Sequence, residues 1–308
     1  NHGTTTAPGG TIGLCAGQTV LVSTSPDGRG LSAQVTLPQG SVDNEGHLIA
    51  DAGTIMAQAR VVNQNGFVQA NSVRNDHGTI ELVAGDSLNL GASSTISAQG
   101  DASAVSAGGS ITLKSGNVFS DQAGSKLNFF GGAPGGNGGQ LEISAPNLGG
   151  VQSQIDGHAT GGFRGGSLLL DPTTITLDSA QESTYNTMIT SGGLSQFSVL
   201  ADYIIINTSW TPPSLLSQLN LTATADITLN TLWTLPAWSS LATLNLSAGN
   251  NITVNNNSSG LNWGINAGQN WNLNLTAGTA LAVGSTPASG SDGIYLDGTS
   301  YLQTVNGD

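Results

Sequence analysis

Apolar and polar residues alternate along short stretches of this chain, and one alternating phrase returns again and again. It reads GTIGLCAGQTVLV at Gly10–Val22 and GTIELVAGDSLNL at Gly78–Leu90. The overlay of these two copies matches Ile12 with Ile80, Leu14 with Leu82, Val20 with Leu88 and Val22 with Leu90. A period of two residues is that of a strand with one face in a core and the other in water. Each copy is therefore predicted to be two or three short strands bent around a corner.

Further copies extend the repeat along most of the chain. In the first half they cover Gly109–Ser120, Gly139–Leu148 and Gly166–Leu177, and in the second half they begin at Phe197, Leu219, Leu244 and Leu273. A recurrence every 20 to 30 residues or so is the signature of a solenoid, because one such unit cannot bury its apolar face alone. The sequence therefore predicts an all-β chain: a parallel β-helix of about a dozen coils, with like residues stacked at about 4.8 Å.

Two segments interrupt this regularity. Residues 1–178 and 197–308 read as β-helix, the second part being rich in Asn, Thr and Trp, whereas residues 179–196 read as an irregular insertion. We expect one short helical turn there, packed through Met188 and Ile189. The stretch Asp121–Gly139 carries the tract GGAPGGNGG and is expected to be a loop whose glycines supply backbone freedom.

Composition and charge narrow the class of protein. There are 44 glycines and 8% charged residues, so residues that favour exposed helices are scarce. The formal net charge is −13. The six basic residues, Arg29, Arg60, Arg74, Lys114, Lys126 and Arg164, lie in the first part of the chain. Nucleic acids and anionic lipids need a basic surface, so we predict neither nucleic-acid binding nor membrane insertion. An acidic surface suits a soluble extracellular protein.

The single cysteine excludes an internal disulfide. Cys15 shares its repeat position with Val83 and Lys114, which predicts an outward or corner position. A free thiol or an intermolecular bridge fits that position better than a catalytic thiol, since no histidine is expected beside it. The sequence predicts no metal or cofactor.

The chain begins in the middle of the pattern. Asn1–Ala7 matches Asn44–Ala50 and Asn65–Ala70 as the start of a coil, with no polar cap before it. An uncapped edge strand exposes unpaired backbone N–H and C=O groups that can hydrogen-bond to another strand. We therefore expect a piece of a longer polypeptide, or a subunit that associates end to end with another copy.

Asparagines and tryptophans recur at set places in the repeat. The asparagines expected to form a hydrogen-bonded ladder at coil corners are Asn44, Asn65, Asn207, Asn230 and Asn255. The candidate glycan contacts are Trp210, Trp233, Trp238, Trp263 and Trp271. Trp210 and Trp233 should stack one coil apart. Exposed rings would form a sugar-binding platform, whereas buried rings would fill the core at a wide corner. The sequons at Asn220, Asn251 and Asn274 are expected by chance in this composition.

Four phrases carry a family resemblance: Gly30–Ile55, Val61–Val73, Gly78–Gly91 and Gly165–Leu177. They resemble the shaft of filamentous-haemagglutinin-type exoproteins of two-partner secretion systems, closely over residues 1–178 and more loosely over 197–283. The resemblance implies a right-handed β-helix, secretion by a Gram-negative bacterium through an outer-membrane transporter, and a role in adhesion, aggregation or biofilm. The Asn-Pro-Asn motifs of the family's secretion domain are missing from this sequence. This segment would lie downstream of that domain.

Three functions are therefore weighed. The favoured hypothesis is a non-enzymatic, rigid structural shaft of a surface fibre or adhesin, and the alternative is a module that binds a surface glycan or receptor through its Trp-rich half. The remote alternative is a polysaccharide-degrading enzyme, which needs two convergent carboxylates. The nearest candidates are Asp292 with Asp297, Asp171 with Asp178, and Asp202 with Asp226, and none of these pairs forms a cluster across adjacent coils.

Overall fold

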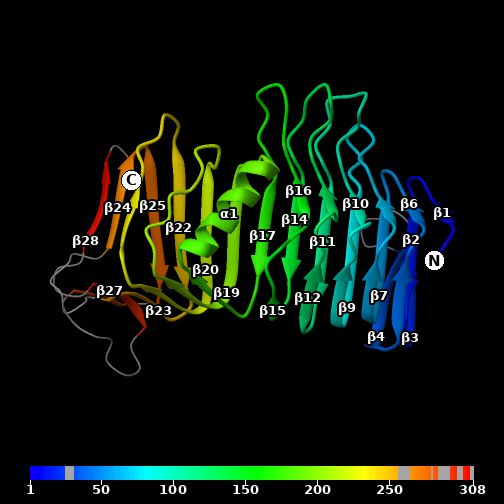
Figure 1. Ribbon diagram of the computed structural model, residues 1–308, viewed down its shortest axis with the longest axis horizontal. Coiled ribbons are helices and arrows are strands. Elements are labelled where there is room, and N and C mark those ends of the chain that lie inside the picture. Colours follow the sequence, from blue (N-terminus) through cyan, green and yellow to red (C-terminus); the bar gives the residue numbers. More distant parts are fainter. Residues whose placement is uncertain (25–30, 256–263, 279, 284–291, 297–300, 306–308) are drawn as a thin grey trace. The chain divides into compact units, whose positions relative to one another are not determined.

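The structure, a computed structural model, describes residues 1–24, 31–255, 264–278, 280–283, 292–296 and 301–305. The described residues form long parallel sheets and a single α-helix, so the chain is mostly β, as predicted (Figure 1). They divide into two compact units. The first is Asn1–Asp171 with Ser191–Leu194, and the second is Pro172–Thr190 with Ser195–Asp308.

The described residues of the first unit include the strands β1 to β17. They are β1 (Thr4–Thr6), β2 (Thr11–Cys15), β3 (Gly17–Thr24), β4 (Leu31–Pro38), β5 (Ser41–Asn44), β6 (His47–Ile49), β7 (Thr54–Gln64), β8 (Phe67–Gln69), β9 (Thr79–Leu90), β10 (Thr95–Ser97), β11 (Ser110–Ser115), β12 (Val118–Asp121), β13 (Lys126–Asn128), β14 (Gln140–Ser144), β15 (Asn147–Leu148), β16 (Gln154–Asp156) and β17 (Ser167–Asp171).

The chain of the first unit passes back and forth between two parallel sheets. One sheet has the order β1-β6-β8-β10-β13-β16. In the other, β2 and β5 pair with the two halves of β7, β7 pairs with β9, and β9 pairs with β11 and β12. β14 and β15 follow, and β17 pairs with β14. Each return to a sheet therefore places a new strand beside the previous one.

The register places equivalent residues of the repeat directly beside each other, as the overlay of copies predicts. One buried column is Ile12, Ile55, Ile80, Ile111, Leu141 and Leu168. The other sheet has its own column of Leu48, Val68, Ile96, Leu127 and Ile155. Along β9 the side chains alternate between buried and partly exposed positions. The core therefore consists of the inward residues of successive repeats, each resting on its equivalent.

The predicted match of Val20 and Val22 with Leu88 and Leu90 is wrong. β3 and β4 form an antiparallel hairpin that pairs with no other described strand, and the main sheet resumes only at β5. Val42 therefore takes the column position beside Val62 and Leu88. The error has a physical reason: the alternation of β3 is the same in a hairpin as in a sheet strand, so periodicity cannot tell the two apart.

The Gly-rich interruption is also shorter than expected. Within Asp121–Gly139, β13 pairs with both β10 and β16, so the repeat continues through it. The loop proper lies between β13 and β14.

A column of glycines explains why most copies of the phrase begin with Gly. Its members are Gly10, Gly53, Gly78, Gly109, Gly139 and Gly166, each directly before a strand. The amide of Ser110 donates to the carbonyl of Gly78 at 3.0 Å. This bond holds the Gly78 carbonyl close to Gly109, the residue before Ser110. A Cβ on Gly109 would therefore collide with the oxygen of Gly78. Close approach of two backbones requires glycine here.

The second unit contains one helix and the remaining strands. They are β18 (Thr174–Leu177), α1 (Ser179–Gly192, whose last two residues count with the first unit), β19 (Gln196–Ile206), β20 (Gln218–Leu229), β21 (Leu232–Leu235), β22 (Ala242–Ala248), β23 (Asn251–Val254), β24 (Gly264–Gln269), β25 (Trp271–Ala277), β26 (Ala280–Val283), β27 (Gly293–Leu296) and β28 (Tyr301–Val305).

Parallel pairing in register recurs in the second unit. β18, β19 and β20 are successive neighbours, β20 pairs with β22 and β23, and β25 and β27 extend these two. A separate sheet has the order β21-β24-β28, and β26 pairs with β27. The predicted copies lie in one column of Phe197, Leu219, Leu244 and Leu273.

The expected irregular insertion is a helix of 14 residues rather than one turn. Asp178 caps it, because its carboxylate accepts the amides of Ala180 and Gln181. Met188 and Ile189 are buried, as predicted. The ring of Tyr185 lies against Phe197, with centroids 4.8 Å apart, and burial raises the pKa of its hydroxyl.

The glycine column gives a first prediction. Gly109→Ala forces a methyl group against the Gly78 carbonyl and should lower the free energy of unfolding by about 1–3 kcal/mol. Gly149→Ala is the matched control, because an added Cβ there meets nothing within 4 Å. Chemical denaturation followed by circular dichroism measures both. Equal stability of the two variants would contradict the close backbone contact.

Candidate functional surfaces

Three of the predicted corner asparagines form a ladder in the second unit. Asn230 donates from Nδ2 to Oδ1 of Asn207 at 2.9 Å, and Asn255 donates to Asn230 at 2.8 Å. The central amide, Asn230, thus accepts from one neighbour and donates to the other, as a side chain with both groups can do at every step of a longer column. The ladder lies on the exposed side of strand ends and serves to hold adjacent strands in register.

A second ladder lies on the outward face of β20, β22 and β25. Asn274 donates to Asn245, Asn245 donates to Asn220, and Asn220 donates to the hydroxyl of Ser198. Sequence reasoning missed it and treated Asn220 and Asn274 only as chance sequons. The signal was present in the recurring LNL of each copy, whose asparagine alternates with two leucines that are buried in β20 and β22 and half-buried in β25.

In the first unit the predicted ladder is only partly as expected. Asn44 is buried, accepts from Asn1 at 2.9 Å and donates to Gln64 at 2.8 Å. The register places Asn44 beside Gln64, so Asn65 falls one residue later, on the exposed corner. Asn65 therefore does not belong to this ladder, and Gln64 takes its place.

Another outward column of the first unit ends in a carboxylate. Asn89 donates to Asn63, and Asn63 donates to Asp43 at 2.6 Å. Ser41 also donates to Asp43. These bonds, first from Ser41 and then from Asn63, lower the pKa of Asp43 because they favour the charged carboxylate. The column thus ends in a group that accepts hydrogen bonds without needing to donate one.

Four of the tryptophans are core side chains. Trp210, Trp233 and Trp271 are at most 1% exposed and Trp238 is 9% exposed. Trp210 and Trp233 stack with ring centroids 6.3 Å apart and 11° between planes, as predicted. Trp233 donates its indole N–H to the Trp210 carbonyl, and Trp271 donates to the Pro236 carbonyl.

This burial corrects the glycan-contact hypothesis for these four rings. Glycan contact needs an exposed ring face, whereas these four rings are buried, and the N–H groups of Trp210, Trp233 and Trp271 donate to partners within the chain. Their size suits them to a wide part of the core. Trp263 lies outside the described residues.

Four of the candidate carboxylates accept hydrogen bonds within the fold. Asp171 accepts the hydroxyl of Ser144, Asp178 caps α1, and Asp202 accepts the hydroxyl of Thr224. Asp226 accepts from Asn251. Asp297 lies outside the described residues, so its pairing with Asp292 is not placed.

The remaining titratable groups gather in small sets only. Asp156 and His158 form an exposed pair at 2.5 Å, and the imidazole stacks on Phe130. Among the described residues, no three His, Cys, Asp or Glu side chains come together as a metal site would require. Cys15 is half-buried and shares its column with Gln58, Val83 and Lys114, as predicted, and burial raises the pKa of its thiol.

Comparison with protein-family models, with curated proteins and with solved structures found no match to the chain. Within the part of the chain that the structure describes, no helix has the length and apolar character needed to cross a membrane.

The exposed ladder gives a second prediction. Asn230→Ala removes two amide hydrogen bonds and should lower the free energy of unfolding by about 1–2 kcal/mol. Asn255→Ala removes its one donated bond and should cost about half as much. Denaturant titration of both variants provides the comparison. If the two variants unfold at the same denaturant concentration as the parent, the ladder does not stabilise the fold.

Proposed function

We propose that this chain is a right-handed parallel β-helix of about a dozen coils and acts as a rigid structural shaft. In this proposal it is a segment of a secreted bacterial surface fibre or adhesin, exported through an outer-membrane transporter, and associates end to end. The observation that carries the proposal is the register: in both units, like residues stack in continuous columns of parallel strands.

The parallel pairing of successive strands supports a coiled path of the chain with a right-handed turn. In the first unit the chain alternates between two sheets and each strand lies parallel to its predecessor in the same sheet. Connections between parallel strands of one sheet are almost always right-handed. Apart from β4, the strands within the phrases that resemble haemagglutinin-type shafts belong to this pattern, and that resemblance is the source of the proposed secretion and surface location.

The outer surface also suits a shaft. Its columns carry hydrogen-bonded amides such as Asn220, Asn245 and Asn274, which link each strand to the next and are uncharged. Lateral ladders of this kind resist sliding of one strand over another, because every strand would lose its bonds together. A stiff, evenly bonded column is what a spacer between a cell surface and its target requires.

Electron microscopy of the purified chain tests the proposal. We expect rods of constant width, with polymers that lengthen end to end as the protein concentration rises. Compact, isometric particles at every concentration would contradict a shaft. Display of the chain between a surface anchor and a reporter domain adds a functional arm, in which removal of the chain should bring the reporter closer to the cell.

Deletion of one whole repeat is a sharper test of the coil. Removal of residues 80–110 joins Thr79 to Ile111, which occupies the column position of Ile80. The shortened chain should fold, since every remaining strand keeps an equivalent neighbour. Removal of residues 80–109 is the control, because it places Ser110 in that position and turns the following strand over.

Circular dichroism and thermal unfolding report the outcome. The deletion of 80–110 should retain the strand signal and a cooperative transition, and the deletion of 80–109 should lose them. Equal behaviour of the two chains would exclude a register-locked repeat.

A further inference from the structure

The hairpin of β3 and β4 has one apolar face. Val20 lies beside Val35 and Val22 lies beside Ala33 in the antiparallel register. Thr19, Leu21 and Ser23 alternate with them and belong to the opposite face. Val20 and Val22 are 39% and 56% exposed, so the apolar face is not covered by the rest of the unit.

A matching apolar surface lies opposite this face, on the outer side of β2 and β7. Met56 belongs to an outward column whose next three members are Glu81, Thr112 and Glu142. Beneath the hairpin that column holds Gly13 and Met56 instead. Met56 is only 5% exposed although it faces away from the core. The outer face of the sheet thus changes from polar to apolar where the hairpin stands.

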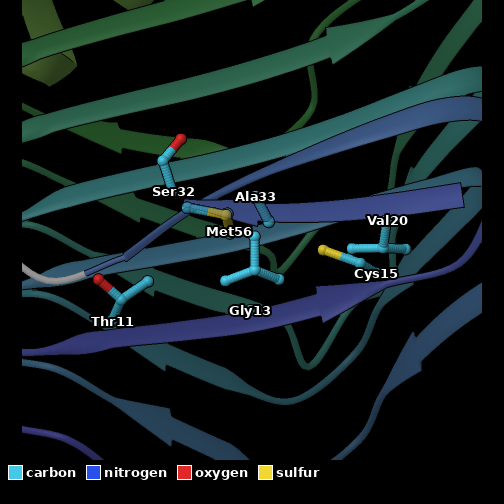
Figure 2. Close-up of a pocket in the computed structure, with 8 residues that line it drawn as sticks. Thr11, Gly13, Cys15, Val20, Ser32, Ala33 and Met56 are labelled. Carbon is cyan, nitrogen blue, oxygen red and sulfur yellow. The ribbon is translucent and has the colours of Figure 1, made fainter. Parts of the chain in front are cut away.

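Between these two surfaces lies a cavity of about 420 Å³, lined by Cys15, Val20, Val22, Ala33 and Met56 among others. Figure 2 shows Cys15, Met56 and Val20 around this space. Small-molecule sites have volumes of about 300–1,000 Å³ and mostly apolar walls. We refer to this space as the hairpin groove.

The base of the hairpin is tied to the main sheet by backbone hydrogen bonds. The amide of Gln39 donates to the Ala16 carbonyl at 3.2 Å, and the Ala16 amide donates to Gln58 of β7 at 2.8 Å. Leu37, at the end of β4, has a φ of 47°, a left-handed conformation that is strained for a branched residue. The hairpin is therefore anchored at one end in a defined conformation while its apolar face stays exposed.

The polarity of the described lining residues indicates which class of ligand the groove would bind. Among the residues that the structure describes, the groove is lined by uncharged side chains, and its polar groups include the hydroxyls of Thr11 and Ser32 and the thiol of Cys15. A charged ligand would lose its hydration there without a counter-charge, which is costly. Glu81, next to Met56 in the column, and the net charge of −13 further disfavour an anion.

We propose that the hairpin groove binds an uncharged, apolar small molecule of hydrocarbon or aromatic character. Val20, Val22 and Met56 provide the apolar contacts, and the hydroxyls of Thr11 and Ser32 accommodate a single polar group. The proposal does not rest on the proposed shaft: one wall of the groove is the outer face of β2 and β7, and the other is the hairpin, which lies outside the stacked columns.

Titration of the chain with N-phenyl-1-naphthylamine, a neutral probe that fluoresces in apolar surroundings, tests the proposal. We expect saturable binding with one site per chain. The same probe should slow alkylation of Cys15 by a maleimide several-fold, since the thiol lines the groove.

Met56→Glu is the decisive variant. Glutamate already occurs twice in this column, at Glu81 and Glu142, so the chain should still fold, although repulsion from Glu81 should lower its stability modestly. A charge in the groove should weaken probe binding at least tenfold. Leu21→Thr is the control, because Leu21 lies on the other face of the hairpin and is 60% exposed. It should bind the probe as the parent does, and circular dichroism should show all three chains folded.

Three results would overturn the proposal. They are the absence of saturable binding, unchanged affinity in Met56→Glu, and equal loss of affinity in Leu21→Thr, which would indicate adsorption to the exposed hairpin. Analytical ultracentrifugation addresses a second copy of the chain as the occupant. A dimer that dissociates in Met56→Glu would assign the groove to self-association and contradict a small-molecule site.

Discussion

Parallel backbone hydrogen bonding between successive repeats is the constraint on which this structure depends. It brings each residue beside its equivalent in the next repeat at the inter-strand spacing of about 4.8 Å. Every position of the repeat must then tolerate a neighbour of its own kind. In the core, Ile and Leu pack on equivalent Ile and Leu residues. On the outer surface, amide side chains hydrogen-bond to equivalent amides, and glycine occupies the positions where two backbones are in contact. Scarce charged residues follow from the same condition, because like charges in adjacent strands repel.

Much of this pattern could be predicted from the sequence, because stacking makes the repeat visible as a recurring phrase. The column of Ile12, Ile55 and Ile80, the asparagines Asn207, Asn230 and Asn255, and the stacked pair Trp210 and Trp233 all recur at repeat spacing. Whether a ring faces inward or outward is a different matter. Burial depends on the width of the core at that corner, which spacing does not encode, so the tryptophans could be aligned but not oriented from sequence.

The predictions that were wrong concern positions where the local sequence pattern fits more than one tertiary partner. The alternation of β3 suits a hairpin and a core strand equally, and only the return of β4 decides between them. Asn65 was misplaced because a corner offers two candidate positions one residue apart, and the register favours Gln64. The length of α1 was underestimated, although Asp178 followed three residues later by Gln181 is a recognisable capping pattern. The hairpin groove itself required the structure, since its walls come from two separate segments.

The position of the hairpin also suggests how such a chain can vary. It enters between β2 and β5, at a corner, and the columns on both sides continue undisturbed. Insertions at corners leave the stacked strands alone and add surface of their own composition. A repetitive scaffold thus carries non-repetitive features without loss of register.

Cysteine cross-linking measures that register most directly. In a Cys15→Ser background, cysteines in place of Thr222 and Ser247, which are register partners on the outer face of β20 and β22, should form a disulfide readily on mild oxidation. Cysteines in place of Thr222 and Asn245 are diagonal neighbours and should not. Efficient bonding of the diagonal pair, or failure of the register pair, would contradict the stacking of equivalent residues.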